Sequence, residues 1–396
     1  MIFLALIYLA FISLGLPDSL LGSSWPLMNE DFGVPVGYAG SVSMLISGST
    51  IVSSLFSHHL ISRFGTGRVT VISVAMTAVA LLGFSVSPSF YWLLALAIPL
   101  GMGAGAVDSG LNEFVAEHYE ARHMNWLHCF WGVGAMLGPI LMASLAQGGH
   151  GWRSGYSSIS GIQFALVVLL LFSLPMWKRY ERPSPLHAEE ETKDRGEKQG
   201  LLAPLRAKGT VFALLTFFLY TSIEASMMLW GASYLVNVKE ILPENAAGWV
   251  SLFFLGITAG RMLSGFVSMK VNNESLIRAG SLLIIVGVVL MLLPLPTVIT
   301  IGAFIIVGLG LAPIFPSMLH QTPVYFGKKQ AQAAMGLQMA FAYTGTTLMP
   351  PLFGQFFARG SFSWMPYVLL ICSIALLAST QLLAALAKRR GAEESI

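Results

Sequence analysis

Long apolar segments follow one another along almost the whole chain. Their expected bounds are 2–28, 37–62, 69–87, 90–116, 124–146, 156–177, 209–236, 245–269, 276–294, 297–319, 330–357 and 362–387. A helix that crosses a bilayer needs about 20 mostly apolar residues, so twelve such helices use most of the 396 residues and leave short connections. The sequence therefore predicts an all-α membrane protein of twelve transmembrane helices, each antiparallel to the next.

The chain lacks the charges that a water-exposed surface requires. Only 10% of its residues are charged, whereas an average soluble domain has about 25%. This shortage excludes a soluble enzyme, and the 25 Phe and 9 Trp exclude a disordered chain. The net charge of +3 is too small to indicate nucleic acid as a partner. Cys129 and Cys372 lie in apolar segments without metal-ligand spacing, so neither a metal site nor a disulfide is expected.

One connection differs from the others. Residues 178–208 carry many charges of both signs and divide the helices into six and six, which predicts an N-terminal half (1–177), a linker and a C-terminal half (209–396). If both termini are cytoplasmic, eighteen of the 22 Lys and Arg residues lie on the cytoplasmic side, and Arg153, Lys239 and Arg359 lie outside. Cytoplasmic loops are rich in Lys and Arg, so we expect both termini on the cytoplasmic side of the plasma (inner) membrane.

Four acidic residues lie well inside the expected helices: Asp18, Asp108, Glu113 and Glu224. A charge at bilayer depth costs at least about 2.5 kcal/mol, so such residues face the bundle interior or a water-filled cavity and mark functional sites. Asp18 follows Pro17, which weakens a helix. Asp108 shares a helix face with Asn112, four residues later.

Asp18 and Asp108 are the predicted proton carriers. A carboxyl group removed from water holds its proton more firmly, and a neighbouring carboxylate strengthens the effect. No basic residue lies mid-membrane in the first half to neutralise these two acids. Glu113 lies about 140° around the helix from Asp108, so a different role is expected for it.

The helices also offer groups that suit a polar solute such as a sugar, namely aromatic rings for C–H surfaces and amides or carboxylates for hydroxyls. The candidate substrate contacts are Asn112, His128, Glu224, Trp230, Gln338, Gln163 and Tyr343. For His128, Gln163 and Gln338, an interhelical hydrogen bond is the competing interpretation. The chain shows no nucleophile–base spacing, metal cluster or phosphate-binding loop, so we expect neither an enzyme nor a cofactor.

The two halves repeat each other weakly. In the first helix an acid, Asp18, precedes Trp25, and in the seventh Glu224 precedes Trp230. Repeats of this kind between two groups of helices are typical of secondary transporters, which bind their solutes near the bilayer midplane.

Six stretches in register resemble the fucose:proton symporter family of the major facilitator superfamily. They are Pro17-Asp18-Ser-Leu-Leu, Asp108-x-x-x-Asn112, Asn125-x-x-His128, Glu224-x(5)-Trp230, Gly310-Leu-Ala-Pro313 and Gly336-Leu-Gln338. The resemblance covers residues 1–385 and implies the major facilitator fold, alternating access and sugar symport with protons by a monomer. Asp18 and Asp108 stand where that family carries proton coupling and substrate recognition, although its fourth-helix acid is a glutamate.

Two alternatives remain within the same fold. The pair of Glu224 and Trp230 resembles glucose-transporting relatives, some of them coupled to sodium, so sodium is an alternative coupling ion. The glycine-rich fifth helix resembles a motif of drug:proton antiporters, which makes a proton-driven exporter of amphipathic compounds the alternative function. A non-transporting receptor is disfavoured.

The loop between the second and third helices resembles a short basic loop that latches the cytoplasmic side of this superfamily. It reads Ser62-Arg63-Phe64-Gly65-Thr66-Gly67-Arg68. The resemblance implies that Arg63 or Arg68 pairs with Glu113 or Glu117 as a cytoplasmic latch. The competing interpretation is that these basic residues only fix the orientation of the helices in the membrane.

Overall fold

The computed structural model describes residues 2–180, 205, 207 and 209–393, and these residues form long helices without any strand. The first half contains α1 (Ile2–Asp18), α2 (Leu20–Phe32), η1 (Val36–Tyr38), α3 (Ala39–Phe64), α4 (Thr66–Ser85), α5 (Phe90–His118), α6 (Ala121–Gln147) and α7 (Gly151–Tyr180). The second half contains α9 (Thr210–Lys239), α10 (Pro243–Trp249), α11 (Ser251–Val267), α12 (Asn273–Leu292), α13 (Thr297–Leu311), α14 (Ile314–Phe326), α15 (Lys328–Arg359), η3 (Phe362–Trp364) and α16 (Met365–Glu393).

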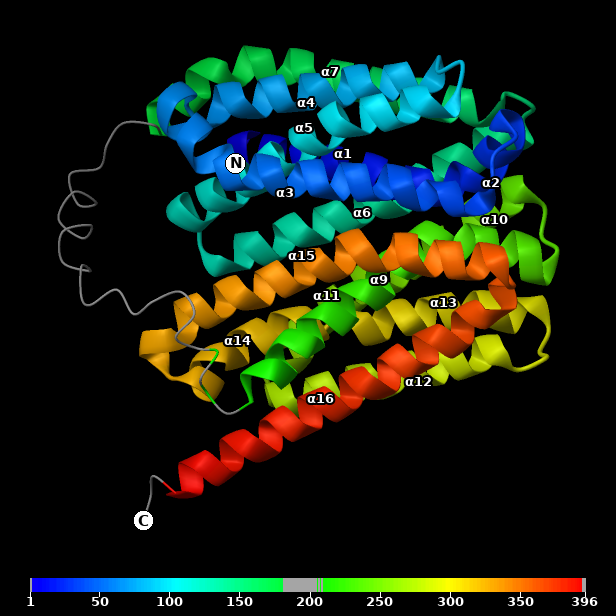
Figure 1. Cartoon of the computed structure of the whole chain (residues 1–396). Coiled ribbons are helices and arrows are strands. Elements are labelled where there is room, and N and C mark those ends of the chain that lie inside the picture. The colour runs from blue at the N-terminus through cyan, green and yellow to red at the C-terminus, as the bar shows by residue number, and fades with distance from the viewer. Residues whose placement is uncertain (1, 181–204, 206, 208, 394–396) are drawn as a thin grey trace.

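The two groups of helices lie side by side with their axes roughly parallel (Figure 1). The described ends of the chain and the helix ends that flank residues 181–208 lie at one end of the bundle, called here the linker end. The opposite end is called the loop end. Most of the predicted linker, 178–208, falls outside the described residues, although α7 continues to Tyr180.

The predicted twelve-helix membrane fold is confirmed. Within the described part of the chain, eleven helical segments are long and apolar enough to cross a membrane. The twelfth is α15, whose 32 residues run the length of the bundle beside them (Figure 1). It is less apolar because it carries several Gln, Thr and Gly residues, and it packs against α9 and α3.

Three of the spans are interrupted. The first breaks at Ser19, directly after Pro17 and Asp18, as the proline predicts. The other two breaks lie at Val250 and at Ala312–Pro313. Such breaks are tolerated at membrane depth where protein or a water-filled cavity covers the freed backbone groups. The break in the first span is therefore a natural place to look for a cavity.

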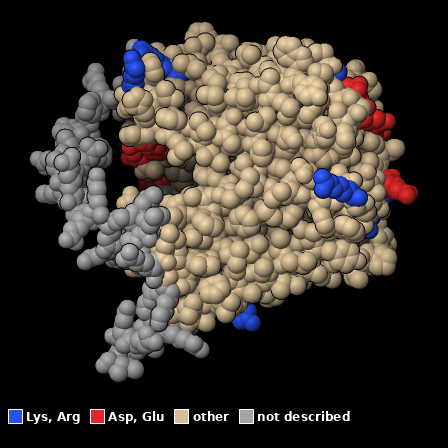
Figure 2. All heavy atoms as spheres, viewed as in Figure 1, with Lys and Arg blue, Asp and Glu red and all other residues tan. Residues whose placement is uncertain are grey.

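The outer surface is suited to lipid. Large apolar side chains point outward along the helices, and Leu55, Phe172 and Val298 are each more than three-quarters exposed. On the face shown in Figure 2, most charged side chains lie toward the two ends of the bundle, and the area between them is largely uncharged. This distribution is the one expected of a protein that crosses a bilayer.

Candidate functional site

The two halves meet tightly at the loop end. Gly40 of α3 lies so close to α15 that a Cβ atom there would stand 2.6 Å from Cα of Pro351. Gln147 at the end of α6 donates a hydrogen bond of 3.0 Å from its amide to Oδ1 of Asn245 on α10. These contacts join the first half to the second and close the loop end.

The linker end is open. Figure 2 shows a hollow at this end, on the face in view, with acidic side chains inside it. Tight contact at one end and a hollow at the other are the arrangement expected of a transporter caught open to one side.

Asp18 lies at the break between α1 and α2, in the middle of its span. Asp18 is exposed although it stands inside the bundle, and its side chain contacts α6. Nε1 of Trp131 on α6 donates a hydrogen bond of 2.8 Å to Oδ2 of Asp18. The predicted proton carrier therefore faces the space between helices.

Asp108 lies on α5 and is partly exposed. Nδ2 of Asn112 donates a hydrogen bond of 3.0 Å to Oδ1 of Asp108, so the predicted shared face of these two residues is present. Asp108 is near enough to interact electrostatically with Asp18 in its own half and with Tyr343 on α15 of the other half. The two acids therefore belong to one site.

The second half contributes an ion pair. A guanidinium nitrogen of Arg261 on α11 lies 3.6 Å from Oε1 of Glu224 on α9. Their side chains are 21% and 15% exposed, respectively, so both are shielded but reachable. The hydroxyl of Tyr220 lies beside both groups, and His128 of α6 is within electrostatic range of Arg261.

One contact joins these two parts across the halves. Cζ of Arg261 lies 5.3 Å from the centre of the Trp131 ring, which is within the range of a cation–π interaction. Asp18, Trp131, Arg261 and Glu224 therefore form a continuous chain of contacts. Sequence reasoning missed Arg261 as part of the site, although a basic residue inside a span was itself a signal.

Three predicted substrate contacts lie elsewhere. Gln163 is buried and donates to the carbonyl of Ser13 at 2.6 Å. Trp230 is buried and donates from Nε1 to the carbonyl of Pro350 at 2.8 Å. Gln338 is 1% exposed, and its Oε1 accepts from the hydroxyl of Thr322 at 2.9 Å. Each of these hydrogen bonds lies within one half. Gln163 and Gln338 form bonds between helices, which is the competing interpretation given above for these two residues.

The predicted latch residues lie at the linker end, at the ends of α3, α4 and α5. Oε1 of Glu113 lies 3.1 Å from Nδ1 of His58. Glu117 approaches His118 at 3.9 Å. In the described part of the chain, no ion pair joins Arg63 or Arg68 to either acid. The latch is therefore not formed in this open state.

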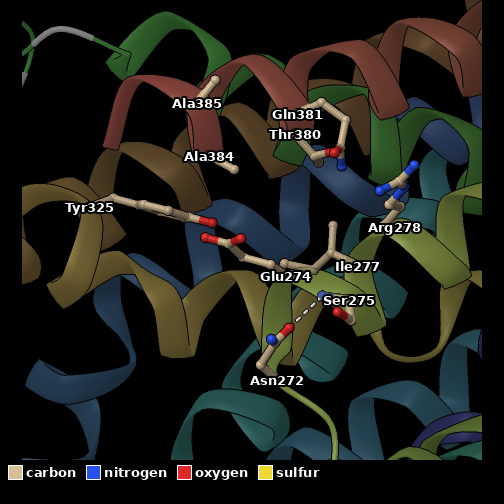
Figure 3. Close-up of a pocket in the computed structure, with 10 residues that line it drawn as sticks. All are labelled: Asn272, Glu274, Ser275, Ile277, Arg278, Tyr325, Thr380, Gln381, Ala384 and Ala385. Atoms are coloured by element: carbon tan, nitrogen blue, oxygen red, sulfur yellow. Dashed lines mark hydrogen bonds between the residues drawn. The ribbon is translucent and has the colours of Figure 1, made fainter. Parts of the chain in front are cut away.

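A separate pocket of about 360 Å³ lies at the linker end of the second half, between α12, α14 and α16 (Figure 3). The carboxylate of Glu274 and the hydroxyl of Tyr325 point toward each other in it. Its lining contains none of the predicted site residues. The candidate site is therefore the open cavity between the halves and not this pocket.

Comparison with known proteins agrees with this architecture. The chain is 25% identical over 351 residues to the glucose/mannose transporter GlcP of Bacillus subtilis. The alignment covers 88% of this chain and 86% of GlcP. The chain is 24% identical over 317 residues to the 3-(3-hydroxy-phenyl)propionate transporter of Escherichia coli, with 76% and 73% covered.

Solved structures show the same fold. A structure of the nucleoside transporter NupG superimposes with a TM-score of 0.75 at 12% identity, over 96% of this chain and 98% of that one. A bacterial homolog of the lysosomal transporter Spinster, in an inward-facing and occupied conformation, gives a TM-score of 0.67 at 12% identity, over 97% and 94%. The sequence pattern described as Major Facilitator Superfamily matches residues 7–331 and 242–395. The chain therefore belongs to the Major Facilitator Superfamily and is a membrane transporter, not an enzyme.

Proposed function

We propose that this protein is a secondary active transporter that moves a sugar together with a proton by alternating access. The observation that supports the proposal is that Asp18 and Asp108 lie within electrostatic range of each other inside the bundle, and that both are at least partly exposed. Two acids that share a water-reachable site can take up a proton on one side of the membrane and release it on the other. No nucleotide site is needed for such a cycle.

The charges of the cavity favour a neutral solute. Three carboxyl groups, those of Asp18, Asp108 and Glu224, face a single guanidinium, Arg261, which already pairs with Glu224. An anionic solute would meet repulsion from the unpaired carboxylates. The name of the Bacillus relative, a glucose/mannose transporter, fits such a cavity better than that of the relative named for an aromatic acid.

We assign solute binding to the cavity-facing members of the predicted set, namely Asn112, His128, Tyr343 and Glu224. Tyr343 is 38% exposed and belongs to the second half, whereas Asn112 belongs to the first. A solute held between them would touch both halves, which is what alternating access requires. Gln163, Trp230 and Gln338 support the two halves from within.

We place the linker end in the cytoplasm because most basic residues of the sequence lie there. In this orientation the cavity faces inward and the loop end is the extracellular seal. In this state the proton carried by Asp18 and Asp108 would leave toward the cytoplasm, because the proton concentration is lower there.

An uptake assay in right-side-out vesicles tests the proposal. Labelled D-glucose, D-mannose and L-fucose should accumulate under an inward proton gradient, and sugar addition should make the external medium alkaline. Accumulation that follows a sodium gradient instead would make sodium the coupling ion. Expulsion of a hydrophobic cation with no response to any hexose would establish the exporter and overturn the sugar proposal.

A latch variant tests the role proposed for Glu113. Closing the linker end would let Arg63 or Arg68 pair with Glu113, and exposed ion pairs contribute about 0.2–1 kcal/mol. Glu113→Gln should therefore raise the ratio of inward-open to inward-closed protein by about 1.4- to fivefold. The measurement is labelling of the partly exposed Cys129 from the cytoplasmic side of inside-out vesicles. Unchanged labelling from both sides would count against the latch.

A further inference from the structure

We infer that Arg261 and Trp131 couple cation uptake at Asp18, in one half, to the state of Glu224, in the other. Arg261 is then a positioning residue that is shared between the two acids. This inference rests on the proposed role of Asp18 as a proton carrier, but not on the identity of the solute.

The first observation is that Trp131 is held from two directions. Its N–H group donates to Asp18 at 2.8 Å, and its ring faces Arg261 at 5.3 Å. An ionised Asp18 polarises the indole through this hydrogen bond and makes the ring face more negative, which strengthens its attraction for the guanidinium. A protonated Asp18 is a weaker acceptor, so the attraction decreases.

The second observation is that Arg261 is not fully committed to Glu224. The shortest distance between them is 3.6 Å, whereas a charge-assisted hydrogen bond between such groups measures about 2.7–2.9 Å. The guanidinium therefore stands between two partners. When Asp18 takes up a proton, the attraction of Trp131 for Arg261 decreases, and Arg261 can move fully to Glu224.

The third observation is the fixed spacing of α6 and α11. Gly132, next to Trp131, lies directly against the side chain of Thr258, one turn before Arg261. A side chain at position 132 would separate the helices. The close approach of the two helices therefore keeps Trp131 and Arg261 in contact.

Other groups near Asp18 must be considered in any pH experiment. Asp108 approaches from α5, and His128 and Cys129 stand on α6 within range of Arg261. From α7, Gln163 contacts α1 but does not titrate. Glu224 and Tyr220 stand on α9, and Tyr343 on α15. Because of these neighbours, the pH response has to be assigned by substitution of Asp18 itself.

The test follows the tryptophan emission of the purified full chain in nanodiscs as a function of pH, without any solute. The chain has 9 Trp, so the Trp131 component is taken as the difference between each protein and the same protein with Trp131→Phe added. We expect a pH transition in the wild type that is absent in Asp18→Asn.

The midpoint of that transition reports the coupling. Arg261→Gln removes a cation that favours the ionised Asp18, so the midpoint should rise by about one pH unit. Glu224→Gln removes an anion that competes for Arg261, so the midpoint should fall. Arg261→Lys keeps the positive charge, so its midpoint should lie closer to that of the wild type than the midpoint of Arg261→Gln does. Glu30→Gln, an exposed acid on α2, is the matched control and should leave the midpoint unchanged.

A transition that persists in Asp18→Asn, is missing in the wild type, or does not move in Arg261→Gln and Glu224→Gln overturns the inference. If Arg261→Gln does not fold, Arg261→Lys and Glu224→Gln still decide it. No sugar is present in this experiment. A negative uptake assay would therefore not affect the pH midpoints, and unchanged pH midpoints would not affect the uptake result.

Discussion

Asp108→Asn will abolish uphill accumulation of the transported sugar while exchange across the membrane continues. One charge that crosses a potential of 100 mV gains about 2.3 kcal/mol, which supports roughly 50-fold accumulation. The asparagine amide keeps the shape of the side chain and a hydrogen bond with Asn112, but it cannot give up a proton. The accumulation ratio should therefore fall to about one.

Two assays on the same proteoliposomes separate coupling from binding. Counterflow exchange of labelled D-glucose should remain within about tenfold of the wild type, because it requires no net proton movement. Glu30→Gln, which changes an exposed acid far from the cavity, should accumulate sugar like the wild type. Full accumulation by the Asp108→Asn variant would remove Asp108 from the coupling role.

Gly40→Ala will hold the loop end open. The added Cβ would stand 2.6 Å from Cα of Pro351, so α3 must withdraw from α15. Overpacking of this kind costs about 1–3 kcal/mol, and the cost applies only to the state in which the loop end is closed. The equilibrium should therefore move toward the outward-open state by about five- to 150-fold.

Cys129 provides the measurement. It is partly exposed within range of Arg261 in the cavity, whereas Cys372 is buried. In a Cys372→Ser background, an impermeant maleimide added outside right-side-out vesicles should label the Gly40→Ala protein at least fivefold faster. Gly48→Ala is the matched control, since a Cβ at Gly48 on the same helix meets nothing within 4 Å. Equal labelling of both variants would show that the contact with Pro351 is not the seal.

Local features of the site could be predicted from the sequence because helix geometry fixes them. Asp108 and Asn112 are four residues apart in one helix, so their hydrogen bond follows from the helical repeat. The break after Asp18 follows from Pro17, which removes a hydrogen-bond donor and disturbs the preceding turn. The acids could be identified because a charged side chain inside a span costs free energy and usually marks a functional site.

Contacts between distant helices could not be predicted in the same way. Nothing in the sequence tells which face of α11 meets α6, so the pairing of Arg261 with Trp131 needed the structure. The same limit applies to Gln163 and Gln338. Their amides need partners inside the membrane, but composition alone cannot distinguish Ser13 and Thr322 from a solute hydroxyl as the partner.

The low apolarity of α15 has a consequence for the biogenesis of the protein. A segment that enters lipid poorly by itself must leave the translocon together with a helix that shields its polar side, and α9 is the main partner of α15. The seventh crossing would then have to wait, inserted but unpaired, until the eleventh is synthesised. Ribosome-bound chains that end shortly after α15 should consequently remain near the translocon when α9 is deleted, and depart when it is present.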